Sequence, residues 1–366
     1  MHGLIMLPPA GASEAERWVA AGRRACAQDL ILRLSAVDKI KSVIALVAEE
    51  EDRDCLRKLG AEVRMSAGSN FQFGAVLQEL ITSEGIRELA YFGGASAPLL
   101  EQAAMAGLID GVLSKDERFG IVNNLHSTDW LLINDAELIV AHSHRLPSDN
   151  PLGWVLSREA GVVIEATEPS AATRLDIDTP TDLFMAWGHH AMGDALSEFL
   201  KELPPEIKNK MEAIRKIMDT PASTMTVIGR ASAHVWQSLV TSTQIWVRLF
   251  VEERGMVASH RLERGEVRSL IGQMLDELGP GEFIGRLENM AQAVLWDTRV
   301  WMGTRPEWPS SADRFAADLG WVDAIQDARL AELTEDIHNS QIPILAGGYG
   351  VVGGGLYALI ESLRPE

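Results

Sequence analysis

The sequence contains very little cysteine. Only Cys26 and Cys55 occur in 366 residues, which argues against a disulfide scaffold and favours a reducing compartment. It also lacks a run of about 18 apolar residues, the length that a membrane-spanning helix needs. The apolar segment near its start is interrupted by Pro8 and Pro9 before it is long enough for a secretion signal. We therefore expect a cytoplasmic protein without a membrane span.

Positive charge is also scarce. Lys and Arg number 33 against 52 Asp and Glu, a net charge of −19, which argues against a general surface for nucleic acids or anionic membranes. Lysine is absent after Lys216, and residues 225–366 contain twelve arginines instead. Arginine makes planar, bidentate contacts with carboxylates and phosphates. These arginines therefore form either surface ion pairs or an anion site, and no pattern indicates an oligomeric state.

Apolar residues are plentiful, at 46% of the chain, and this length favours two folded domains. In the first 200 residues, short apolar runs alternate with helical segments. The runs are 3–7, 41–48, 61–65, 89–92 and 120–122. This alternation predicts an α/β fold with a mainly parallel sheet. Ligands bind at the carboxyl ends of such strands, so the loops at 8–13, 93–98 and 123–129 are the places where a site is expected.

After residue 200 the pattern changes. The break Lys201–Pro205 (KELPP) precedes segments whose periodicity is mainly helical. The predicted helices are 233–250, 266–278, 281–293 and 330–339. We therefore predict a first domain over residues 1–205 and a mostly α-helical second domain over 220–366.

One segment, Arg174–Leu183 (RLDIDTPTDL), combines a strand end with a helix start. Apolar and acidic residues alternate up to Asp178, as in a strand with one buried face. Thr179 then suits a helix cap and Pro180 the first helical turn, where Asp182 favours the helix dipole. The carboxylates of Asp176 and Asp178 would leave the strand beside a helix N-terminus, an arrangement suited to a divalent cation and an anionic ligand.

The first 200 residues resemble the nucleotidyltransferase branch of the GT-A fold. The resemblance rests on the DIDTPTDL segment, on "SVIALVA" (42–48) and on "ELAYFGGASAPLL" (88–100), in this order. The relatives that it suggests are the molybdenum-cofactor guanylyltransferases and the phospholactate guanylyltransferases. It implies a Rossmann-like GT-A domain that binds a nucleoside triphosphate with Mg²⁺. An acceptor phosphate or hydroxyl would attack the α-phosphorus and release pyrophosphate.

The resemblance also implies roles for particular residues. The loop after the first strand would hold phosphates through Gly11 and Ser13, while Asp176 and Asp178 would hold Mg²⁺. The remaining candidates lie in the two loops that follow the fourth and fifth strands, with Asp129 as a third catalytic carboxylate. They are Gly93, Gly94 and Ser96, for the nucleotide, and Asn123, Asn124, His126 and Ser127, for a phosphorylated or sugar-like acceptor. The loop at 123–129 is equally typical of a turn that satisfies its own backbone.

Two segments differ from the family pattern and keep an alternative open. Pro8 and Pro9 remove two backbone donors from the first loop. Residues 93–100 contain no aspartate where the family places its first metal ligand, and Ser96 does not supply the missing charge. The alternative is a nucleotide- or sugar-binding regulatory protein that has lost catalysis.

A third hypothesis places the chemistry in the second domain. Its polar clusters include Arg254, Arg261, Arg268, Arg299 and Arg314, which suit either ion pairs or a phosphate pocket. The glycine-rich tail 347–355 precedes a predicted helix, so Gly348 and Gly350 can approach a ligand phosphate. The same glycines also suit close helix packing. A dinucleotide fingerprint is excluded, because the chain ends before the required acidic residue.

Overall fold

The computed structural model describes residues 1–66 and 71–363, which form two compact units. The first unit consists of residues 1–10, 20–176 and 191–198, and the second of residues 11–19, 177–190 and 199–366. In the described residues no helix combines the length and the apolar character that crossing a bilayer requires. The predicted domain boundaries, 1–205 and 220–366, stay predictions. The second unit also includes two short segments, 11–19 and 177–190, that lie within the predicted first domain.

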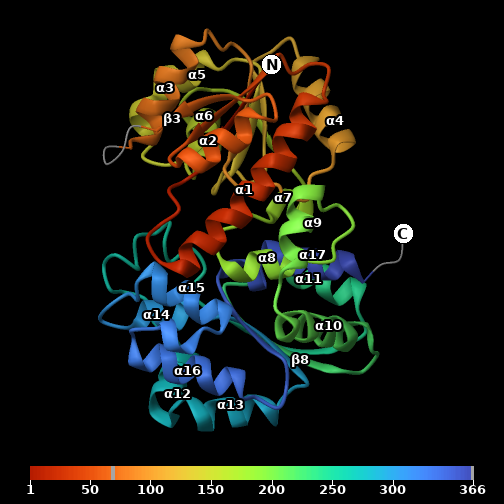
Figure 1. Ribbon diagram of the computed structural model, residues 1–366, viewed down its shortest axis with the longest axis vertical. Helices are drawn as coiled ribbons and strands as arrows, with labels where there is room; N and C mark the ends of the chain where they lie inside the picture. The colour runs from red at the N-terminus through yellow and green to blue at the C-terminus, as the bar shows by residue number, and fades with distance from the viewer. Residues whose placement is uncertain (67–70, 364–366) are drawn as a thin grey trace. The chain divides into compact units, whose positions relative to one another are not determined.

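The first unit is built on a seven-stranded sheet (Figure 1). Its strands are β1 (His2–Met6), β2 (Ser42–Val47), β3 (Glu62–Met65), β4 (Leu89–Gly93), β5 (Phe119–Val122), β6 (Trp130–Ile133) and β7 (Val163–Ala166). The spatial order is β3-β2-β1-β4-β6-β5-β7, and β6 alone runs antiparallel to its two neighbours. The predicted α/β fold with a mainly parallel sheet is confirmed.

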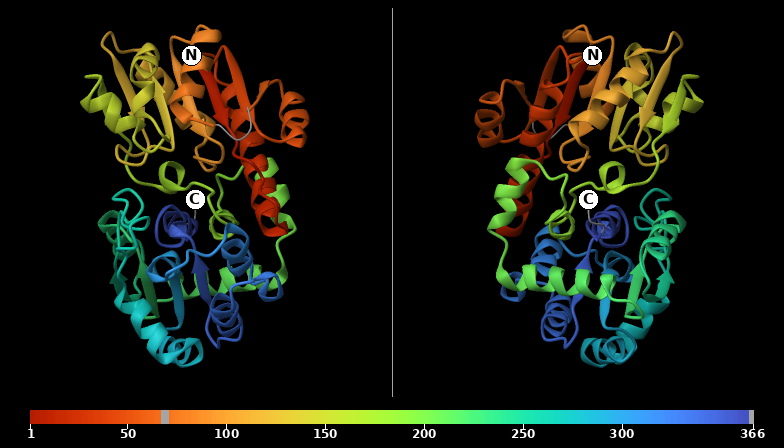
Figure 2. Two further views of the ribbon diagram at one scale, coloured as in Figure 1. Left: turned by 90° about the vertical axis from the view of Figure 1, so that its left-hand side faces the viewer. Right: turned by 90° about the vertical axis from the view of Figure 1, so that its right-hand side faces the viewer.

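Helices cover both faces of this sheet (Figure 2). Those of the first 201 residues are α1 (Glu14–Ser35), α2 (Glu50–Arg57), α3 (Phe73–Ser83), α4 (Gln102–Leu113), α5 (Glu137–His142), the 3-10 helix η2 (Ser143–Arg145), α6 (Leu152–Arg158), α7 (Ala171–Arg174), α8 (Pro180–Ala186) and α9 (Asp194–Lys201). On one face, residues of α1, α2 and α4 pack on alternate strand residues such as Ile5 and Phe92. On the other, α3, α5 and α6 pack on Leu4 and Tyr91. Alternate strand residues point to opposite faces, so both faces are apolar, as in a parallel sheet covered on each side.

The second unit contains a smaller parallel sheet. Its strands are β8 (Thr224–Gly229), β9 (Trp246–Val251), β10 (Ala293–Asp297) and β11 (Ile344–Gly347), in the order β11-β10-β8-β9. The remaining helical segments are α10 (Pro205–Asp219), α11 (Ala233–Ser242), α12 (Leu270–Leu278), α13 (Pro280–Glu288), α14 (Arg299–Thr304), α15 (Ser311–Leu319), η3 (Val322–Ala324), α16 (Ala328–His338), η4 (Tyr349–Val352) and α17 (Gly354–Ser362). Each pair of neighbouring strands is parallel.

The prediction of a mostly α-helical second domain missed this sheet. Helices are abundant, but the predicted helix 233–250 ends at Ser242, and its last residues belong to β9. The four strands are only four to six residues long. The periodicity of a short apolar run does not show whether it is a buried strand or part of a buried helix. Helices occupy most of the sequence between these strands, so the strands were interpreted as helical too.

The glycine-rich tail packs on α8. A Cβ atom at Gly347 or Gly348 would lie within 3 Å of the side chain of Thr181 or Thr179, respectively. At Gly350 it would lie 1.7 Å from Oδ1 of Asp182, and Gly355 similarly faces Met185. Four of the tail glycines therefore permit close contact with the helix that begins at the DTPTD segment, which is the packing alternative for this loop.

Substitution Gly350→Ala tests this packing. The Asp182 carboxylate accepts hydrogen bonds from the backbone N–H groups of Asp178 and Thr179, so it cannot move aside without losing the helix cap. We expect overpacking to lower the free energy of unfolding by roughly 1–3 kcal/mol, measured by denaturant titration. Gly285→Ala, at a helical position with no neighbour within 4 Å, is the matched control and should stabilise by about 0.5–1 kcal/mol. Equal effects of the two substitutions would contradict the packing role.

Candidate functional site

Polar side chains gather at the carboxyl edge of the seven-stranded sheet. Asn123 follows β5 and is 1% exposed. Its Oδ1 accepts hydrogen bonds from the backbone N–H groups of Asp129 (2.9 Å) and Trp130 (3.3 Å), and its Nδ2 donates to Oδ2 of Asp129 (2.5 Å). Because β6 is antiparallel, its first residues reach the same edge as the end of β5. Asn123 thus orients the Asp129 carboxylate at the predicted ligand edge.

Two further acidic groups lie near Asp129, around the hydroxyl of Tyr91. This hydroxyl donates a hydrogen bond to Oδ2 of Asp149 at 3.0 Å. Burial raises the pKa of Tyr91 well above its usual value, and the negative charges of Asp149, Asp129 and Asp176 raise it further. Gly93, at the end of β4, lies against this group, since a Cβ there would approach the Asp149 carboxylate at 3.4 Å. Asp149 was not predicted as a site residue from the sequence, because no predicted strand or motif precedes it.

The DIDTPTDL segment reaches this edge through Asp176. A β-bridge pairs Asp176 with Ser96 in antiparallel orientation, and the N–H of Ala97 donates to the carbonyl of Leu175 at 3.3 Å. This bridge places Asp176 beside the loop 93–98. Ser96 itself is buried, and its hydroxyl donates to the carbonyl of Gly93 at 2.8 Å. Gly94 permits close approach of β1, because a Cβ there would lie 2.4 Å from the carbonyl oxygen of Met6.

Asp178 belongs to the second unit, whereas Asp176 belongs to the first. The pair that the sequence suggested as Mg²⁺ ligands is therefore divided between the two units. Asp178 is exposed and lies beside Asp182, whose carboxylate forms a capping box with Thr179, the predicted helix cap. Within residues 1–66 and 71–363, no three His, Cys, Asp or Glu side chains are grouped so as to hold a metal ion by themselves.

The loop after β1 binds an internal carboxylate. The side chain of Glu16 accepts hydrogen bonds from the N–H groups of Ala12 (3.2 Å) and Ser13 (3.0 Å) and from the hydroxyls of Ser13 (2.8 Å) and Ser311. These bonds lower the pKa of Glu16 to about 2. Gly11 adopts φ +83° beside the same carboxylate. Gly11 and Ser13 lie in the second unit, and a phosphate would have to displace Glu16 to use the donors there.

The loop 123–129 contains local turns as well as the oriented aspartate. The Asn124 side chain accepts a hydrogen bond from the N–H of His126 at 3.2 Å, and the Ser127 hydroxyl donates to Asn150 at 2.7 Å. These bonds are typical of a turn that satisfies its own backbone. The functional roles of Asn124, His126 and Ser127 stay predictions, as do those of Asn123 and Asp129.

The smaller sheet has a topological switch point of its own. The chain moves outward from β8 to β9 and then returns to the other side of β8 at β10, so the strand order reverses between β8 and β10. Open α/β sheets bind ligands at such a point. Here the residues that follow these strands form a bidentate ion pair between Arg230 and the fully buried Asp297, at 2.6 and 3.1 Å. In the sequence, each of the two strands is a mostly apolar run that ends beside a charged residue, Arg230 or Asp297. The pair was not predicted, because these segments were interpreted as part of a helical domain.

The predicted arginine pocket separates into two groups. Arg299 forms a buried bidentate ion pair with Asp318, at 3.0 and 2.6 Å, and its charge, together with burial, lowers the pKa of the nearby Arg314 to about 10. Arg254, Arg261 and Arg268 lie instead in the loop between β9 and α12. Their contacts there include an ion pair of Arg261 with Glu253 and hydrogen bonds to backbone carbonyls from Arg261 and Arg268. Two of the five arginines, Arg261 and Arg299, therefore form internal ion pairs, and the phosphate pocket stays a prediction.

No model of a known protein family matches the sequence, and no curated protein sequence matches it. Several solved structures are similar in fold. A cytidylyltransferase from Leptospira borgpetersenii is 16% identical, with a TM-score of 0.40 over 57% of this chain and 95% of that one. A nucleotide-diphospho-sugar transferase from Desulfovibrio desulfuricans is 11% identical, with a TM-score of 0.41 over 57% and 96%. A CMP:2-keto-3-deoxy-manno-octonic acid synthetase in complex with CTP is 12% identical, with a TM-score of 0.34 over 46% and 89%.

The buried Asp182 predicts a pH dependence of stability. Burial, and then the charge of Asp178, raise the pKa of Asp182 to about 7, against about 3.9 in an unfolded chain. Between about pH 4 and 7 the folded state holds a proton that the unfolded state has lost, so stability falls as the pH rises through this window. We expect Asp182→Asn to flatten the fall of Tm, measured by calorimetry. Glu335→Gln, exposed on α16, should leave the wild-type slope unchanged. Identical slopes for Asp182→Asn and the wild type would refute the assignment.

Proposed function

We propose that the first unit binds a nucleoside triphosphate at the carboxyl edge of its seven-stranded sheet. The protein then transfers the nucleotidyl group to a phosphorylated or sugar-like small molecule. An oxygen of the acceptor attacks the α-phosphorus, the bond to the β-phosphate breaks, and pyrophosphate leaves. The observation that carries the proposal is the placement of Asp176 beside the loop 93–98, whose Gly93 lies against the Asp129 backbone and the Asp149 carboxylate.

Oxygen donors of this kind fit Mg²⁺. The ion binds proteins through one or two carboxylates and takes its other ligands from substrate phosphates and water. Asp176 and Asp129 would supply the carboxylates, and the bound ion would neutralise charge on the triphosphate. Asn123 would hold Asp129 in place through its two side-chain contacts. Asp178 belongs to the other unit, and its predicted role as a ligand is not part of this proposal.

A second function is favoured by a specific observation. The Glu16 carboxylate uses the backbone donors of Ala12 and Ser13, and Pro8 and Pro9 lack N–H donors altogether. The phosphates of a triphosphate would thus find fewer donors after β1 than a glycine-rich loop offers. This arrangement supports the alternative of a nucleotide- or sugar-binding protein that does not transfer the nucleotidyl group.

The test measures binding and turnover separately. We expect calorimetry to show binding of CTP or GTP that is stronger with Mg²⁺ than with EDTA, because the ion bridges the carboxylates and the phosphates. Asp176→Asn should weaken the Mg²⁺-dependent binding by about tenfold or more. Asp110→Asn, exposed on α4, should bind like the wild type. Pyrophosphate release is measured with the same nucleotides and a panel of sugar phosphates.

The outcomes separate the two functions. Mg²⁺-dependent binding with pyrophosphate release supports the transferase. Binding that is equal with Mg²⁺ and EDTA, without release of pyrophosphate, rejects the transferase in favour of the binding protein. Failure of both nucleotides to bind at millimolar concentration rejects a nucleotide site in the first unit altogether.

A further inference from the structure

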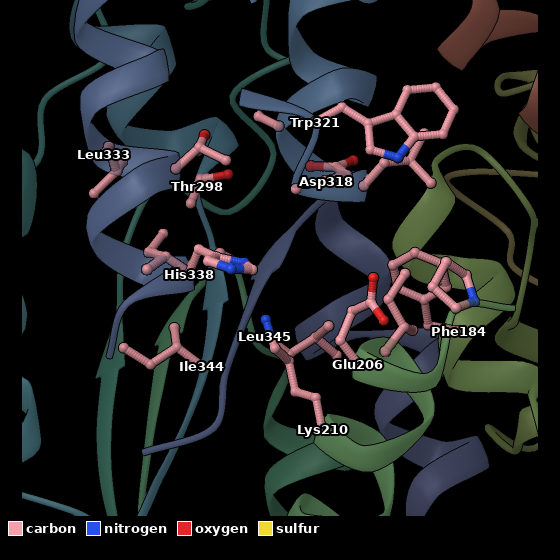
Figure 3. A pocket seen from close by; sticks show the side chains of 18 of the residues that line it. Phe184, Glu206, Lys210, Thr298, Asp318, Trp321, Leu333, His338, Ile344 and Leu345 are labelled. Atoms are coloured by element: carbon pink, nitrogen blue, oxygen red, sulfur yellow. The ribbon is translucent and has the colours of Figure 1, made fainter. Parts of the chain in front are cut away.

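The second unit contains a pocket beside the edge strand β11 (Figure 3). Its volume is about 280 Å³, at the lower limit of the sites that bind small molecules. Its walls come from α8, α10, α15, α16 and β11, all of which supply residues of the second unit. The pocket thus lies within one unit and is separate from the carboxyl edge of the seven-stranded sheet.

Most of the pocket wall is apolar. Phe184, Trp321, Leu333 and Leu345 line it, and Figure 3 shows them on different sides of the space. Apolar and aromatic walls with a small number of polar groups are typical of small-molecule sites, in which the walls supply affinity and the polar groups fix orientation. The chemical class of the ligand is therefore set by the few polar groups present.

Lys210 is the decisive polar group. Its side chain extends from α10 into the pocket, toward Leu345 and His338 (Figure 3). Burial lowers the pKa of Lys210, and no charged neighbour contributes to the shift. In the part of the chain that the structure describes, no carboxylate forms an ion pair with it. A desolvated ammonium without a counter-ion is costly, and an anionic ligand would compensate it.

The acids around the pocket limit the charge of that anion. Asp318 lines the pocket, but its carboxylate is held by the bidentate contact with Arg299. Glu206 lies one turn before Lys210 on the same helix and is exposed. A ligand with one negative charge matches Lys210, whereas a dianion would also meet the repulsion of Glu206.

We propose that this pocket binds a small monocarboxylate with an apolar body, whose carboxylate pairs with Lys210 and whose body contacts Phe184, Trp321, Leu333 and Leu345. The site does not depend on the nucleotide proposal, because the two sites share no residue. It gives the second unit a ligand of its own.

Calorimetric titration of the full chain with three probes of similar apolar size tests the proposal. The probes are 4-phenylbutyrate, the neutral 4-phenyl-1-butanol and 3-phenylpropyl phosphate. We expect saturable binding of 4-phenylbutyrate that is at least about tenfold tighter than that of the alcohol, since hydrogen bonds to charged groups are strong. The phosphate should bind more weakly than the carboxylate at a pH where it is a dianion.

Variants locate the binding. Lys210→Met should weaken 4-phenylbutyrate binding by about tenfold or more, while Lys210→Arg should keep it within a few-fold, because the charge remains. Lys216→Met changes an exposed lysine of the same helix, outside the pocket wall, and should bind like the wild type. Bound 4-phenylbutyrate should also protect Lys210 of the wild-type protein from reductive methylation, measured by peptide mass spectrometry.

Four results would overturn the proposal. They are no binding of 4-phenylbutyrate by the wild type, equal binding of the acid and the alcohol, undiminished binding by Lys210→Met, and tighter binding of 3-phenylpropyl phosphate than of the carboxylate. The protection experiment keeps the test decisive if Lys210→Met folds poorly, because unprotected methylation of Lys210 in the saturated wild type would equally contradict it.

Discussion

The packing of the second unit depends on the close contact between the glycine-rich tail and the start of α8. A carboxylate, Asp182, closes the cap of α8 and at the same time lies against Gly350, so that neither residue tolerates added volume. Interiors packed at this density transmit small changes in volume directly. The contact joins residues 179–182 to the chain end at 347–355, and the smaller parallel sheet is completed by the strand that leads into this tail.

The fold was predictable where apolar runs were separated by clear helical segments. The runs 3–7, 41–48 and 89–92 form strands at nearly the expected residues, namely His2–Met6, Ser42–Val47 and Leu89–Gly93. A strand buried on both faces is apolar throughout, which makes it easy to recognise. The smaller sheet was not predictable in the same way. Its short strands adjoin amphipathic helices, and Trp246–Val251 continued a periodic segment whose first part is α11.

The candidate site was predictable only in part, for a related reason. Local sequence identified Asp176, Asn123 and Asp129, because each stands at the end of a recognisable strand or motif. It did not identify Asp149, which reaches Tyr91 from 58 residues away. Nor did it show that Glu16 fills the loop after β1. A serine followed three residues later by a glutamate, as at Ser13 and Glu16, indicates a helix start but not which other donors the carboxylate binds. Long-range pairing of polar groups depends on the tertiary fold rather than on spacing.

The division of the chain has a consequence for modularity. Successive segments alternate between the units at residues 10/11, 19/20, 176/177, 190/191 and 198/199, so the backbone passes between them five times. Two domains joined by one linker can be separated, exchanged or lost singly in evolution. Units interleaved in this way share α1 and α9, and deletion of one would leave helices of the other truncated. Neither unit can therefore be excised at a single linker with all of its helices intact.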